Sequence, residues 1–263
     1  MSLLAHQIAI GGCLRAAGAN QLTLLADKPC TVTFDREELA QLVELVQSPD
    51  FGFTRCVHRS WCVGRTEAAA ELTLSALPIE QRQQLVEDWV AAGGGTAFDP
   101  VSEAGEFLEL IASRLADPSH ELTICRMERA VYRASEAALS FMSPDASLLD
   151  DPTARLVAGK GATLVRFLAE PHQLLEAIRT KNRFPPVSKD CVPVLFAPGF
   201  VGLFRIANTE EVAIWGKLTR PITMRQLTRA RHVRETIDEF FRVGVVEQVS
   251  QESLSAVEVP MVC

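Results

Sequence analysis

The chain has 263 residues, of which 48% are hydrophobic and 22% are charged, and its formal net charge is −7. This composition supports a folded core and excludes a chain that is disordered in bulk. No segment contains the roughly 18 consecutive apolar residues of a membrane-spanning helix, and no basic residue precedes the short N-terminal apolar run, which argues against a signal peptide. Seven scattered cysteines are typical of reduced thiols, so we expect a cytoplasmic protein with no membrane partner.

The charge is distributed unevenly along the chain. Residues 1–150 carry 11 Lys+Arg and 21 Asp+Glu, giving −10, whereas residues 151–263 carry 15 and 12, giving +3. This asymmetry indicates two regions with different partners. A net charge of +3 is small for a dedicated DNA-binding domain, which usually has a clear basic surface.

The first half of the chain is predicted to be almost entirely helical. Apolar periodicity, caps and breakers predict helices over about 2–17, 35–46, 66–77, 79–92, 100–115 and 119–141. The stretch from Ser48 to Gly64 interrupts this pattern and is interpreted as a structured loop. It contains Cys56, His58 and Cys62, three potential metal ligands within seven residues.

Those three residues do not make a convincing metal site. Zinc sites need a fourth ligand and usually pair cysteines two to four residues apart, and no second Cys/His pair has metal-ligand spacing. No nucleophile elbow or glycine-rich phosphate loop is present, since Gly93–Gly95 ends a helix and does not open one. We therefore expect no metal, no cofactor and no catalytic residue on this chain. The alternative is an enzyme in its own right with a Cys/His nucleophilic pair, because such residues meet in space and not in sequence.

The second half alternates between strands and helices. Residues 142–160 are predicted to be a linker, 162–168 a strand and 171–179 a helix. Residues 191–249 then contain two strands, three helices and a closing strand, typical of a small winged-helix-like module. The sequence thus predicts an α+β protein with an N-terminal helical domain over 1–145 and a winged-helix-like domain over 155–255.

The helix that begins at Ser119 carries candidate contact residues. Arg126, Arg129 and Arg133 are spaced i, i+3 and i+7, which places them on one helix face. Together with His120 and Glu128, they are interpreted as contacts to a partner protein or to a packed junction between the two halves. The alternative is a solvated face with weak local ion pairs.

A second basic cluster lies near the third helix of the module. Arg225, Arg229, Arg231 and Arg234 could contact nucleic-acid phosphates, acidic side chains of a peptide, or solvent alone. Composition does not distinguish these three alternatives.

Two segments, Asp117–Ala134 and Val194–Trp215, resemble the partner subunits of multinuclear non-haem iron enzymes that modify ribosomally made peptides. Such subunits occur in methanobactin and 3-thiaglutamate biosynthesis, and the closer likeness is to the latter. The resemblance covers roughly residues 100–249. It implies a non-catalytic accessory subunit that forms a heterodimer with the iron enzyme, which holds the metal and modifies a peptide cysteine. The chain itself would bind the precursor peptide and present it.

In such a subunit the leader segment of the precursor adds a strand to a small sheet, and apolar pockets provide specificity. The candidate edges are Val194–Ala197 and Leu203–Ile206, beside the helix from Arg231. The predicted peptide-binding residues are Val194, Leu195, Phe196, Leu203, Phe204, Arg205, Ile206, Arg231, Arg234, Ile237 and Phe241. The alternative function is a winged-helix DNA-binding transcription regulator with an N-terminal dimerisation or sensor domain, whose binding would weaken steeply with salt.

Overall fold

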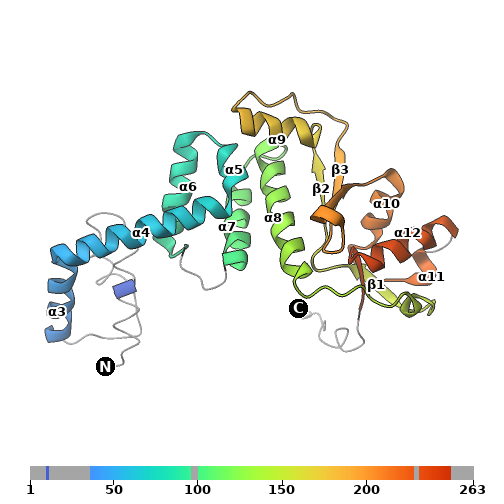
Figure 1. The fold of residues 1–263 in the computed structure, drawn as a ribbon, viewed down its shortest axis with the longest axis horizontal. Coiled ribbons are helices and arrows are strands. Elements are labelled where there is room, and N and C mark those ends of the chain that lie inside the picture. The colour runs from blue at the N-terminus through green and yellow to red at the C-terminus, as the bar shows by residue number, and fades with distance from the viewer. Residues whose placement is uncertain (1–9, 12–35, 96–99, 228–230, 250–263) are drawn as a thin grey trace, which may run out of the picture. The chain divides into compact units, whose positions relative to one another are not determined.

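A computed structural model describes residues 10–11, 36–95, 100–227 and 231–249 (Figure 1). The protein is α+β, with helices and two small antiparallel sheets. It divides into two compact units at Ile111/Ala112. None of the helices within the described residues is both long and apolar enough to cross a membrane. The predicted helix over 2–17 lies almost wholly outside the described residues.

The first unit is helical, as predicted. Its helices are α3 (Arg36–Gln47), α4 (Pro49–Ala69), α5 (Glu71–Ser75), α6 (Ile79–Ala92) and most of α7 (Pro100–Arg114). Helix α4 packs against α3 and α6, and the ring centroids of Trp89 and Phe107 lie 5.3 Å apart. Gly93 ends α6 in the left-handed conformation, with φ of 112°, which glycine adopts without strain.

The predicted loop over 48–64 is instead part of α4. Ser48 caps this helix by accepting a hydrogen bond from the Phe51 amide, and Pro49 occupies the first turn. Gly52 and Gly64 weaken the helical signal in the sequence. Packing against α3 and α6 outweighs that weak local preference.

The second unit contains both sheets. One has the order β5-β1-β6 and the other β2-β3-β4, and all their pairs are antiparallel. The strands are β1 (Arg155–Ala158), β2 (Thr163–Phe167), β3 (Val192–Phe196), β4 (Phe204–Ile206), β5 (Ile222–Thr223) and β6 (Val246–Gln248). The helices are α8 (His120–Ala138), α9 (Pro171–Thr180), α10 (Thr209–Lys217), α11 (Met224–Leu227) and α12 (Arg231–Arg242), with short 3-10 turns η2 (Ala146–Leu149) and η3 (Val201–Leu203).

One hydrophobic core joins the two sheets of this unit. Leu195 of β3, Leu156 of β1 and Val246 of β6 are buried together with Ile237 and Phe240 of α12. Helix α8 lies alongside β2 and β3, away from α10 and α12 (Figure 1). The β2-β3-β4 sheet is thus held between α8 on one face and the core on the other.

The strands of the predicted module belong to two different sheets. Strand β3 pairs with both β2 and β4, whereas the closing strand β6 pairs with β1, which lies in the predicted linker. The compact units also divide earlier than the predicted domains 1–145 and 155–255, because α8 packs on β2 and β3 and so belongs to the second unit. Strand pairing between distant segments decides the first point and packing of a helix on a sheet decides the second, and local sequence patterns report neither.

Close contact between α8 and the start of β2 depends on Gly161. A Cβ atom at Gly161 would overlap the Ala137 methyl group of α8. We predict that Gly161→Ala lowers the free energy of unfolding by about 1–3 kcal/mol, because overpacking displaces the helix. Gly216→Ala in α10 is the matched control, since its Cβ would meet open space and should be neutral or stabilising by at most about 1 kcal/mol. Urea unfolding measures both, and equal effects would contradict the prediction.

Candidate functional site

Strand β3 is the central strand of its sheet, so the predicted edge Val194–Ala197 has no free side. Two hydrogen bonds define its pairing toward β4. The Ala197 amide donates to the Leu203 carbonyl, and the Ala207 amide donates to the Pro193 carbonyl, both at 2.9 Å. Because bonding alternates along an antiparallel pair, the odd-numbered residues of β3 bond to β4 and the even-numbered ones bond to β2.

The same register shows which groups of β2 face outward. Val194 of β3 lies opposite Val165 of β2, so Val165 exchanges its backbone hydrogen bonds with β3. Leu164 and Arg166 therefore direct their N–H and C=O groups away from the sheet. None of the described residues hydrogen-bonds to these outward groups. Strand β2 is thus an open edge, and the sequence did not place it among the candidate edges.

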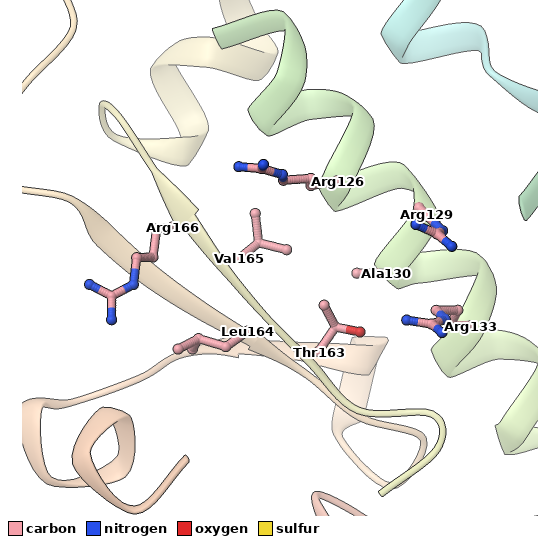
Figure 2. Close-up of a pocket in the computed structure, with 8 residues that line it drawn as sticks. All are labelled: Arg126, Arg129, Ala130, Arg133, Thr163, Leu164, Val165 and Arg166. Carbon is pink, nitrogen blue, oxygen red and sulfur yellow. The ribbon is translucent and has the colours of Figure 1, made fainter. Parts of the chain in front are cut away.

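A groove of about 280 Å³ runs between this edge and α8 (Figure 2). Its lining comprises four consecutive residues of β2 and one face of α8: Thr163, Leu164, Val165, Arg166, Arg126, Arg129, Ala130 and Arg133. In Figure 2, Arg126 and Val165 extend into the space between strand and helix, and Arg166 extends to the other side of β2. The α8 face predicted from its arginine spacing is therefore one wall of this groove.

The groove carries a concentration of positive charge. Four arginines line it, and none of the described lining residues is acidic. Arg126 donates a hydrogen bond to Asp117 at 3.0 Å, and both side chains are more than half exposed, so this pair is weak. The Thr163 hydroxyl is buried with no hydrogen-bond partner among the described residues. The groove can therefore accept an anionic ligand that also supplies a hydrogen-bond acceptor.

Strand β4 is the other edge of the sheet, as predicted for Leu203–Ile206. By the same alternation, Phe204 and Ile206 direct their backbone groups outward, and their side chains are 53% and 63% exposed. Each edge thus offers the outward backbone groups of two residues, Leu164 and Arg166 on β2 and Phe204 and Ile206 on β4.

Arg205 of β4 forms an ion cluster with two glutamates of the same unit, and its side chain is 31% exposed. Its guanidinium bonds to Glu211, which is buried, and to Glu239 at 2.6 Å, and it lies 4.8 Å from the Phe200 ring centroid. Partial burial disfavours the charge, but hydrogen bonding to Glu239 and the charges of both glutamates outweigh it, so the pKa of Arg205 is raised.

The predicted cleft wall on α12 is mostly core. Ile237 and Phe241 are 0% and 2% exposed, so they stabilise the unit and do not line the predicted cleft. Arg234 bonds to Asp150, Asp238 and the Leu149 carbonyl. The side chain of Arg231 lies outside the described residues. Helix α12 is amphipathic, and periodicity alone does not say whether its apolar face meets the core or a ligand.

Two predicted contact residues of α8 are also buried. His120 Nε2 lies 2.8 Å from the Pro185 carbonyl, and its ring packs on Phe184 with centroids 5.6 Å apart. Glu128 is 8% exposed. His120 therefore packs within the second unit, and Arg126, Arg129 and Arg133 are the members of the predicted set that reach the groove.

Cys56, His58 and Cys62 all lie on α4. Cys62 Sγ is 3.6 Å from His58 Nδ1, Cys62 is buried and Cys56 is exposed. Within the described residues, no three His, Cys, Asp or Glu side chains are placed to hold a metal ion. The expectation of a metal-free chain stays a prediction.

The ion cluster of Arg205 generates a stability prediction. Arg205→Ala leaves the buried Glu211 without its charge partner, which should cost about 1–3 kcal/mol or more. Arg179→Ala is the control, because Arg179 pairs with Glu176 on the surface of α9 and an exposed pair is worth about 0–1 kcal/mol. Denaturant unfolding of the two variants is the measurement. Equal losses would show that the Arg205 cluster behaves as a surface pair.

Comparison with known protein families gives no match. Comparison with functionally characterised proteins gives no significant match either. The function of the chain is therefore inferred from the geometry of the groove and its edge strand.

Proposed function

We propose that this chain is the non-catalytic partner subunit of a multinuclear non-haem iron enzyme. In this role it binds a ribosomally made precursor peptide in extended form and presents a peptide cysteine to the iron enzyme for oxidative modification. The observation that carries the proposal is the open edge of β2 beside the groove along α8. The iron stays on the enzyme, and this chain contributes recognition.

An open edge strand is suited to binding an extended peptide. The outward N–H and C=O groups of Leu164 and Arg166 can form main-chain hydrogen bonds with a fourth strand, whatever the peptide's side chains are. Successive side chains of that strand point alternately to the two faces of the sheet. The side chains on one face of the added strand enter the groove, so α8 can contact every second residue of the peptide.

The remaining part of the second unit corresponds to the winged-helix-like module in this proposal. Helices α10, α11 and α12 follow one another between β4 and β6 and share one core with the β5-β1-β6 sheet. Strand β1 completes that sheet from upstream. The module then acts as the base on which the β2-β3-β4 sheet rests through Leu195.

A second candidate function is nucleic-acid binding, favoured by the three arginines of α8 along the groove and by Arg166 on the other side of β2. Guanidinium groups bind phosphates as well as carboxylates. Binding of duplex DNA through several arginines falls steeply with salt, whereas strand addition also depends on uncharged backbone groups and should weaken less with salt. Affinity measured at two salt concentrations therefore separates the two functions.

The first unit presents a surface for the iron enzyme. Phe53, Val57 and Trp61 are spaced i, i+4 and i+8 on α4 and form an exposed apolar stripe, the α4 stripe. Phe53 and Trp61 are 73% and 53% exposed. The Arg65 guanidinium lies 4.8 Å from the Trp61 ring centroid. Aromatic and arginine side chains are the residues that most often dominate protein interfaces.

The edge of β2 is tested with a proline. We predict that Arg166→Pro weakens binding of the precursor peptide at least about tenfold, because proline removes the outward N–H that would bond to the added strand. Arg166→Ala is the matched control, since it removes the same side chain and keeps the N–H. Isothermal titration with the precursor peptide measures both, and circular dichroism verifies the fold.

Equal peptide affinities for these two variants, both folded, would overturn the assignment of the peptide to this edge. Failure of the wild-type chain to bind the precursor peptide at all, together with tight binding of duplex DNA at physiological salt, would replace the partner-subunit proposal with the DNA-binding function.

The α4 stripe is tested in the complex with the iron enzyme. We predict that Trp61→Ala weakens the complex about tenfold, which corresponds to about 1.4 kcal/mol. Ile79→Ala is the control, because Ile79 is 63% exposed and lies outside the stripe, on α6. Co-purification and surface plasmon resonance with the iron enzyme give the affinities. If Ile79→Ala weakens the complex as much as Trp61→Ala does, the α4 stripe is not the surface that binds the iron enzyme.

A further inference from the structure

We infer that the groove between α8 and β2 selects an extended peptide segment with acidic residues at alternate positions, i and i+2. The carboxylates would be bound by Arg126, Arg129 and Arg133 of α8. This inference rests on the proposed addition of a peptide strand to β2 and specifies which sequence that strand carries.

The spacing of the arginines fits this alternation. At about 1.5 Å per residue, Arg126 and Arg133 are separated by about 10 Å along α8, and Arg129 stands between them. Same-face residues of an extended strand are about 6.7 Å apart, because each residue rises about 3.3–3.4 Å. Two carboxylates at i and i+2 therefore fall within the span of the three guanidinium groups. Adjacent acids at i and i+1 would point to opposite faces.

The two faces of the edge differ in charge. The α8 face brings three arginines to the groove. The opposite face carries Arg166, whose side chain extends away from α8 (Figure 2). A peptide carboxylate on the α8 side thus meets several guanidinium groups, and one on the other side meets Arg166. The preference for i and i+2 follows from this difference.

The groups along the helix wall can accept a new carboxylate. Arg126 and Arg133 are exposed, and the exposed pair between Arg126 and Asp117 is weak enough to exchange. Guanidinium groups bind carboxylates through paired hydrogen bonds. The unpartnered hydroxyl of Thr163 lies on the groove side of β2 and can donate to the same carboxylate or to a peptide carbonyl (Figure 2).

The test uses two synthetic peptides of identical composition on a Thr/Val background. One carries two glutamates at i and i+2, and the other carries them at i and i+1. Affinities are measured by fluorescence anisotropy on the full chain and on Arg166→Ala, which removes the arginine of the opposite face. On the Arg166→Ala variant, we expect the alternating peptide to bind at least about tenfold more tightly than the adjacent peptide.

A charge-neutral variant links that preference to the helix. The double variant Arg126→Gln/Arg133→Gln should bind the alternating peptide no more tightly than the adjacent one. Arg179→Gln on α9 is the matched control, because Arg179 is exposed and lies outside the groove, and it should leave both affinities unchanged. Equal affinities of the two peptides on Arg166→Ala, or an unchanged preference in the double variant, would overturn the inference.

The outcomes for this inference and for the proposed function are distinguishable. If the alternating peptide has no advantage but Arg166→Pro still weakens the precursor peptide relative to Arg166→Ala, the edge is used and the acidic selectivity is wrong. If Arg166→Pro binds both the precursor and the alternating peptide as Arg166→Ala does, the peptide does not use β2 and both fail. Tighter binding of duplex DNA than of either peptide, with steep salt dependence, would assign the arginines to phosphates.

Discussion

The antiparallel pairing of β2 with β3 is the constraint on which the candidate site depends. Because β3 also pairs with β4, its hydrogen bonds alternate between its two neighbours, and this alternation decides which backbone groups of β2 are left outward. A shift of one residue would turn Leu164 and Arg166 inward and would also exchange the faces of Val165 and its neighbours. The buried side chains of Val165 and Phe167 oppose such a shift. The core thus fixes the edge that a ligand would meet.

Most of the elements of the second unit can be predicted from local sequence. Ser119 and Asn208 cap α8 and α10 in the structure, with a capping box at Asn208, and the apolar runs at β2 and β3 form strands as expected. The pairing of those strands cannot be predicted in the same way. Strand β6 closes a sheet with β1, almost ninety residues earlier in the chain, and no local pattern encodes that choice.

The arginines show the same limit for the site. Spacing alone identifies the face that carries Arg126 and Arg133, and the structure places that face along a groove. Spacing alone does not distinguish these arginines from Arg205, which is already paired. The ion-pair partner of Arg205, Glu239, lies 34 residues away in the sequence. It also does not show that Ile237 meets the core. Whether a charged or apolar side chain is available depends on tertiary neighbours.

The open edge of β2 also raises the question of how the chain avoids pairing with copies of itself. Edge strands with unpaired backbone groups tend to aggregate, and proteins protect them with charge. Two copies joined through β2 would bring the arginine-lined walls of two α8 helices and two Arg166 side chains together, and like charges at such a contact are unfavourable. An acidic strand would be attracted to this edge, because its carboxylates neutralise the charge of the arginines. The arginines therefore oppose pairing with a like edge, and the same charge pattern favours the acidic peptide strand of the proposed function.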